Sequence, residues 1–300
     1  MTVRIIKLES ELAAADIARK LTEAGLLLEQ QNTADTVVLL QVLDCDEAYC
    51  AKVAESIASF LFNEWVYAYI NERLSERHSY LNDDEREYVS LLTLHALRKA
   101  TIGDRTMDVW EQDLTVALEQ MLHKTAVMHL DLVGFMRFRA RDVLSATDTG
   151  TEEFVSQFLA DREYEEFVSL LRYMLESQPS TRQVVHVFCT DERMWLCDET
   201  GALISDEDVS QAAYQVSDDG EVNVEDLAMS VLITRSPCKI VIHDITHAAP
   251  WPSFSETVER VFLERATRCN HCAACILLEH GDTCPSAVDG HLLAMPDDYE

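Results

Sequence analysis

The sequence predicts an α+β fold that is mainly helical. A long middle region repeats apolar residues at helical spacing, the chain begins with short alternating segments, and an extended hairpin pattern follows Pro179. We therefore expect a central helical bundle, a small N-terminal β-α-β-β unit and a C-terminal α/β region that ends in a cysteine cluster. The expected domains are 1–44 (small α/β lobe), 45–179 (helical bundle), 180–265 (small α/β region) and 266–300 (cysteine-rich tail).

The first 44 residues predict a strand, a helix and two further strands. Residues 2–8 alternate apolar and basic side chains, and residues 14–21 carry one apolar helical face that ends near Gly25. Residues 26–29 and 36–43 are short apolar runs on either side of a polar turn. These segments give the β-α-β-β unit.

The middle of the chain predicts about five helices, hence a bundle. Helical periodicity covers 45–77, 83–99 and 107–123. A further pair of helices is expected from 127 to 178, with a turn near Gly150. The second helix of that pair has the clearest apolar stripe of the chain, formed by Tyr164, Phe167, Val168, Leu171, Met174 and Leu175.

After Pro179 the pattern becomes extended. Residues 183–190 and 194–198 predict a hairpin, residues 224–234 a helix, and residues 238–245 a central strand rich in branched apolar side chains. If the strands at 184–188 and 240–243 pair, His186 and His243 can approach each other.

Composition and charge limit the kinds of partner. The 300 residues are 48% hydrophobic, which indicates a folded chain, and the formal net charge is −30. Such a charge repels phosphate backbones and anionic lipid, which disfavours nucleic acid as a partner, and a protein partner of unknown identity is expected. The start lacks the apolar core of a signal peptide, and no run of about 18 apolar residues predicts a membrane span. A cytoplasmic location is expected.

The strongest chemical signal is the cysteine cluster CNHCAACILLEHGDTCPS. Two-residue gaps allow thiolates to converge on one ion, and four sulfurs, or three sulfurs and an imidazole, satisfy tetrahedral zinc. We therefore expect a structural zinc site, because an ion would tie down a short tail that has little core of its own. The predicted ligands are Cys269, Cys272, Cys275 and Cys284, with His271 and His280 as neighbouring imidazoles.

Other interpretations of the cluster remain open. Bacterial ferredoxins use cysteines at two-residue gaps followed by Cys-Pro, as in Cys284–Pro285, but the gap before Cys284 is too long for that pattern. The alternative function is thus an iron–sulfur or redox protein. The cysteines could also be free thiols, or a knuckle that binds nucleic acid, which the charge opposes.

The sequence contains no nucleophile elbow, no HExxH and no Walker motif, so catalytic residues are not assigned and a non-enzymatic protein is the favoured interpretation. His243, Asp244 and His247 form an H-D-x-x-H pattern at a strand end, which is more often structural than metal-binding because successive side chains of a strand point apart. A hydrolase built on His186, His243 and Asp244 is a minor alternative.

A basic island in the acidic chain consists of Arg137, Arg139 and Arg141. These arginines could bind a carboxylate or phosphate of a ligand, but ion pairs with nearby acidic side chains are the favoured interpretation. The acids concerned are Asp142, Asp161, Glu163 and Glu165.

The sequence resembles the YtxC family of sporulation proteins over roughly residues 50–275. The resemblance is carried by FLFNEWVYAYINERL, GFMRFRARDV, REYEEFVSLLRYMLESQP, VVHVF, LAMSVLITRSPCKIVIH and CNHCAAC. It implies a role in endospore formation and no particular biochemical activity. Together with the cysteine cluster, it predicts a non-enzymatic, interaction or structural role with a structural zinc site.

Overall fold

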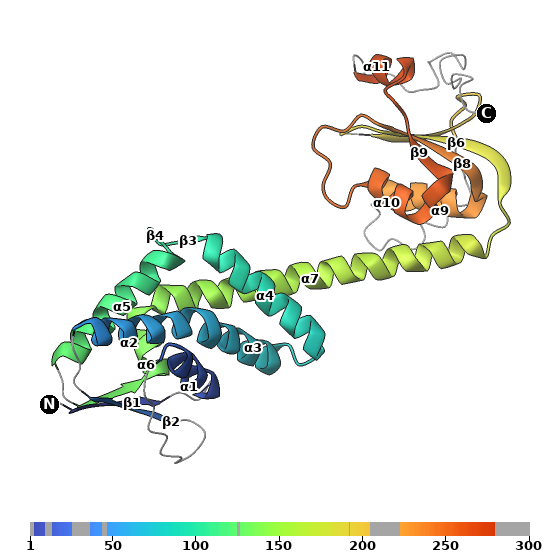
Figure 1. Ribbon diagram of the computed structural model, residues 1–300. Coiled ribbons are helices and arrows are strands. Elements are labelled where there is room, and N and C mark those ends of the chain that lie inside the picture. Colours follow the sequence, from blue (N-terminus) through green and yellow to red (C-terminus); the bar gives the residue numbers. More distant parts are fainter. Residues whose placement is uncertain are drawn as a thin grey trace. The chain divides into compact units, whose positions relative to one another are not determined.

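The computed structural model describes residues 3–9, 14–25, 37–43, 47–124, 127–191, 193–204 and 223–279 (Figure 1). Helices dominate and the strands form small sheets, which confirms the α+β, mainly helical class. The chain divides into two compact units, Met1–Asp161 and Arg162–Glu300. The expected boundaries at residues 44, 179 and 265, and the arrangement of the helices as a bundle, stay predictions.

The first unit contains a three-stranded sheet in the order β2-β1-β5. Strand β1 (Val3–Glu9) pairs antiparallel with β2 (Val37–Leu43) and parallel with β5 (Val127–Asp131). Helix α1 (Ala14–Glu23) follows β1 and buries apolar side chains such as Leu21. The expected strand at 26–29 lies outside the described residues.

Strand β5 corrects the prediction of one helix from residue 127. Residues 127–131 complete the sheet beside β1, and the helix α6 (Leu132–Arg139) begins only at the cap residue Asp131, whose carboxylate accepts a hydrogen bond from Val133 N. The physical reason is tertiary: the edge of β1 offers hydrogen bonds to a segment more than 100 residues away.

Helices make up most of the first unit. Residues 47–77 are one continuous helical segment with a π-helical turn at Leu61–Trp65, as expected for this stretch. Fully buried side chains such as Ile57, Trp65 and Leu118 form the core. The elements are α2 (Glu47–Phe60), α3 (Val66–Arg77), α4 (Asp83–Lys99), α5 (Met107–Lys124) and the β3–β4 hairpin (Thr101–Ile102, Arg105–Thr106).

The helix α7 (Arg141–Glu176) runs unbroken through Gly150, so the predicted turn there is wrong. A glycine inside a helix costs only about 1 kcal/mol relative to alanine, which the packing of a long helix can offset. A Cβ atom at Gly150 would lie 3.9 Å from the Thr93 methyl group, so the position is close to α4 yet not crowded.

The second unit is a four-stranded sheet in the order β7-β6-β8-β9, with helices on both faces. Strands β6 (Thr181–Cys189) and β7 (Met194–Asp198) form the expected hairpin, while β8 (Pro237–Asp244) pairs parallel with β6 and with β9 (Ala266–Arg268). The predicted position of β8 inside the sheet is confirmed.

Side chains of the sheet alternate between two different cores. Val185, Val187, Ile240 and Ile242 belong to the larger core, to which the last turns of α7, the helix α9 (Val224–Arg235) and the helix α10 (Phe254–Phe262) contribute. Phe188 and Cys197 face the smaller core under α11 (Ala273–Glu279). Figure 1 shows α11 on the opposite side of this sheet from α9 and α10.

Two short segments define the limits of the helices α9 and α10. Asn223 caps the helix predicted at residues 224–234, since its side chain accepts a hydrogen bond from Glu225 N at 2.9 Å. A 3₁₀ turn at Leu263–Arg265 leads from α10 into β9. Within the described residues, no helix has both the length and the apolar character needed to span a membrane.

Candidate metal centre

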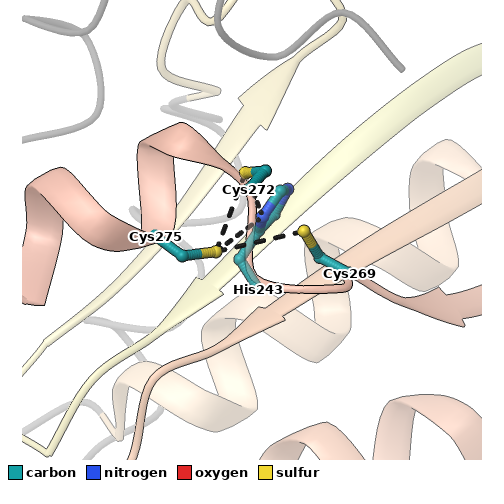
Figure 2. A group of neighbouring side chains, drawn as sticks. All are labelled: His243, Cys269, Cys272 and Cys275. Atoms are coloured by element: carbon teal, nitrogen blue, oxygen red, sulfur yellow. Dashed lines mark hydrogen bonds between the residues drawn. The ribbon is translucent and has the colours of Figure 1, made fainter. Parts of the chain in front are cut away.

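Four side chains of the second unit converge on one face of the sheet. His243 lies near the end of β8, Cys269 directly follows β9, Cys272 precedes α11, and Cys275 lies in the first turn of α11 (Figure 2). The one ligand-type atom that each of them offers lies within 4.8 Å of all the others, so this His/Cys3 group could hold a metal ion. Hereafter we call these four residues the tetrad.

The sheet and the helix place the tetrad. Parallel pairing sets Arg268 of β9 beside Ile242 of β8, so the next residues, Cys269 and His243, are also adjacent. Alternation along β8 turns Ile242 into the larger core and His243 to the opposite face. The chain then turns at His271, whose φ is 59°, and enters α11, which brings back Cys272 and Cys275.

Four distances within the tetrad are close to those expected for ligands that share one ion. His243 Nδ1 lies 3.4 Å from Cys275 Sγ and 3.6 Å from Cys272 Sγ. The sulfur atoms of Cys272 and Cys275 are 3.7 Å apart, and those of Cys275 and Cys269 are 4.0 Å apart. A tetrahedral zinc ion with ordinary bond lengths separates two sulfurs by about 3.8 Å, and a sulfur from a nitrogen by about 3.6 Å.

The side of the tetrad that faces the sheet is shielded from solvent. His243 and Cys275 are each 2% exposed, whereas Cys269 and Cys272 are half-buried. The Phe188 ring stacks on the His243 imidazole with 4.1 Å between the centroids and 10° between the planes. The Phe188 ring therefore covers one face of the histidine ring, and the sulfurs of Cys272 and Cys275 lie near its Nδ1.

Hydrogen bonds between the thiols shift the pKa values of Cys272 and Cys275 in opposite directions. The pKa of Cys272 is lowered to about 3, mainly by the hydrogen bond with Cys275 and further by the bond with His243. The same bond with Cys272, together with burial, raises the pKa of Cys275 well above its ordinary value, and burial raises the pKa of Cys269. A thiolate is the form that ligates metals, and the hydrogen bonds from its neighbours favour that form at Cys272.

A second histidine lies behind the first. His186 Nδ1 and His243 Nε2 are 2.9 Å apart, and His186 is 4% exposed. Burial and the neighbouring His243 lower the pKa of His186 to about 4, which keeps its imidazole neutral near pH 7. The approach of these two histidines, expected if β6 and β8 pair, is confirmed.

A sequence profile of the YtxC-like family matches residues 51–267, which is more than two thirds of the chain. The chain belongs to the YtxC-like family. The matched segment contains His186 and His243 and ends two residues before Cys269, whereas the resemblance seen in the sequence extended to about residue 275. A search of the curated proteins and a search of the solved structures gave no match to this chain.

The structure brings three of the four predicted ligands together in this YtxC-like protein. Cys269, Cys272 and Cys275 belong to the tetrad. Cys284 and His280 lie outside the described residues, so the assignment of Cys284 stays a prediction. His271 is exposed, and its Nε2 lies 3.4 Å from Glu279 Oε2. It therefore contacts a carboxylate and is not part of the tetrad.

His243 was not assigned to the cysteine cluster from the sequence. The sequence did place His243 at the end of a central strand that precedes the cysteines. Only the β8–β9 pairing shows that His243 and the cysteines lie close together. The other two members of the H-D-x-x-H pattern lie elsewhere: Asp244 binds Arg268 and Thr246, and the exposed His247 contacts Asp191. The expectation that the three do not share one direction agrees with these contacts.

The basic island is not neutralised as predicted. Arg137, Arg139 and Arg141 are exposed, and within the described part of the chain no ion pair joins them to the acids that were considered. Arg139 instead stacks over Phe138 at 5.5 Å, and Phe138 is itself 80% exposed. Of those acids, Glu165 pairs with Arg260.

Proposed function

We propose that this YtxC-like protein acts in endospore formation by binding another protein rather than by catalysis, and that a structural zinc ion held by the tetrad fixes its C-terminal segment. Membership in the family supports the sporulation role. The single observation that supports the metal is the group of four contacts, from 3.4 to 4.0 Å long, that link one nitrogen and three sulfurs.

The number of ligands supports a structural ion. Three thiolates and one imidazole fill a tetrahedron, whereas catalytic zinc sites keep one position for water or substrate. The ligands come from a central strand, from the residue after an edge strand, and from the start of α11 and the residue before it. An ion there would cross-link the sheet to a short helix whose own core is small.

The same distances favour one ion over an iron–sulfur cluster. In a cluster the thiolates bind different iron atoms, so their sulfurs stand farther apart than ligands that share a single ion. All four ligand-type atoms of the tetrad lie within 4.8 Å of one another. We therefore propose zinc as the metal and keep the iron–sulfur protein as the alternative that the experiment must exclude.

Elemental analysis and absorbance of anaerobically purified protein test the metal. We expect a colourless protein with one zinc ion per chain and a Cys272→Ser variant without it. Brown protein with bound iron would support the alternative function, and equal zinc in the wild type and the Cys272→Ser variant would defeat the tetrad as the site.

Complementation tests the role. In a spore-forming host that lacks its own copy, the wild-type chain should restore heat-resistant spores, and Cys272→Ser should restore fewer of them. Cys238→Ser is the matched control, because Cys238 is exposed and lies at the other end of β8. Full restoration by Cys272→Ser would show that the metal site is not needed for spore formation. If deleting the gene has no effect on spore formation, the proposed sporulation role is excluded.

A further inference from the structure

We infer that His186 is a positioning residue of the tetrad: it accepts a hydrogen bond from Nε2–H of His243 and thereby fixes Nδ1 of His243 as the metal-binding atom. This inference rests on the proposed metal site and adds to it a residue that contacts no ion. The observation that carries it is the chain of three contacts from His186 through the two nitrogens of His243 to the sulfurs.

The two ring nitrogens of His243 have different surroundings. Nδ1 lies 3.4 Å and 3.6 Å from two sulfurs, while Nε2 lies 2.9 Å from Nδ1 of His186. A neutral imidazole carries one proton, so an Nδ1 that gives its lone pair to an ion leaves the proton on Nε2. That N–H is buried and needs an acceptor, which Nδ1 of His186 supplies when His186 carries its own proton on Nε2.

The fold holds the acceptor in place. His186 lies on β6, which pairs with β8 in a register that sets His186 beside Val241 and Phe188 beside His243. Both histidines belong to buried strand positions inside the sheet, and Phe188 covers one face of the His243 ring. The ring is thus constrained by stacking and by a directed hydrogen bond, and the bond alone distinguishes one nitrogen from the other.

A packing role for His186 predicts different behaviour from a hydrogen-bonding role. If His186 only fills space, a leucine of similar size should leave the metal affinity unchanged. If it accepts the bond, asparagine should substitute for it, because the amide oxygen of asparagine is an acceptor near the position of Nδ1. Loss of a hydrogen-bond partner behind a metal-binding histidine typically lowers metal affinity about 10- to 100-fold.

The test compares the wild type with His186→Leu and His186→Asn, each as the full chain. Zinc affinity is measured by competition with a chromophoric chelator, and cobalt(II) loading reports the ligand set through its thiolate charge-transfer bands. We expect His186→Leu to bind zinc about 10- to 100-fold more weakly than the wild type, and His186→Asn to recover most of that loss. A His186→Leu affinity within twofold of the wild type, or an equal loss in both variants, would overturn the inference.

Val187→Ala is the matched control for a damaged strand. Val187 follows His186 on β6, is fully buried and faces the opposite core, so its truncation weakens the unit without touching the tetrad. Its zinc affinity should match that of the wild type. A loss as large as that of His186→Leu would show that any damage to β6 weakens the site, and would overturn the positioning role.

A measurement on the wild type needs no variant to fold. Long-range proton–nitrogen spectra of the zinc-loaded protein should show His243 protonated on Nε2 and bound through Nδ1, and a proton on Nδ1 would overturn the inference. The two proposals fail differently. A wild type that binds no zinc defeats the metal site itself, whereas zinc binding that does not depend on His186 defeats only this inference.

Discussion

The amide nitrogen of Cys269 donates a hydrogen bond to the carbonyl oxygen of Ile242, 2.8 Å away. This bond continues the β8–β9 pairing one residue past Arg268 and fixes the first cysteine beside the strand residue that precedes His243. The sheet therefore builds half of the tetrad before any ion binds. The other half, Cys272 and Cys275, depends on where α11 begins.

Replacing His243 should abolish tight metal binding. His243→Leu removes the only nitrogen of the tetrad, and the loss of a direct ligand should exceed the roughly 100-fold effect of an indirect one. Chelator competition on the purified chain measures it. Zinc affinity within tenfold of the wild type would show that another group supplies the fourth ligand.

Replacing Cys284 is the complementary experiment. Since the tetrad already supplies four ligands, Cys284→Ser should keep one zinc ion per chain with wild-type affinity. If Cys284→Ser loses the ion while His243→Leu retains it, the original assignment of four cysteines is right and the histidine is a buried neighbour.

Removing the ion should destabilise the protein. Ligand at about 1,000 times its dissociation constant stabilises the folded state by about 4 kcal/mol, so chelation should lower Tm by on the order of 10 °C. Thermal unfolding followed by circular dichroism, with and without chelator, measures the change. The Cys272→Ser variant should melt at one temperature in both conditions, and a wild type that does the same would contradict a structural ion.

The candidate site shows what spacing alone can predict. Two-residue gaps predicted that Cys269, Cys272 and Cys275 converge, because a short gap forces a tight turn whatever the rest of the chain does. The fourth member, His243, depends on the pairing of β8 with β9, whose partners are 26 residues apart in sequence. The meeting of His186 and His243 could be predicted because both strands were recognised and only their pairing had to be assumed.

The fold shows the same division between local and non-local causes. The helix starts at Asp83 and Val224 depend on side chains within one turn, and both starts were predicted from the sequence. Strand β5 was not, because its hydrogen bonds go to β1 and its own sequence also fits a helical stripe. Gly150 failed as a turn signal because a glycine weakens a helix by less than tertiary packing strengthens it.

Removing the cap of α4 should cost measurable stability. Asn82 Oδ1 accepts from Glu85 N at 2.9 Å, and Glu85 Oε2 accepts from Asn82 N at 2.8 Å, which forms a capping box. Asn82→Ala leaves a helix N–H without its partner and should lower the free energy of unfolding by about 0.5–2 kcal/mol in urea titrations. Glu85→Gln keeps both hydrogen bonds of the box and is the milder control. An Asn82→Ala variant as stable as the wild type would contradict the capping role.

Gly150→Ala should stabilise the protein. The residue lies inside α7 with an ordinary helical backbone. Among the described residues outside the neighbouring turns of α7, the added methyl group would meet only the Thr93 methyl at 3.9 Å, which is a normal contact. Alanine is favoured over glycine inside a helix by about 0.5–1 kcal/mol, because it restricts the unfolded chain. The midpoint of urea unfolding should rise accordingly.

Gly103→Ala is the matched control for Gly150→Ala, because Gly103 has equal space for a methyl group but a different backbone. Among the described residues other than its chain neighbours, none has an atom within 4 Å of the added carbon, yet φ is +67°, a conformation that alanine rarely adopts. Gly103→Ala should therefore lower the midpoint while Gly150→Ala raises it. A lower midpoint for both would contradict an uncrowded helical position at Gly150.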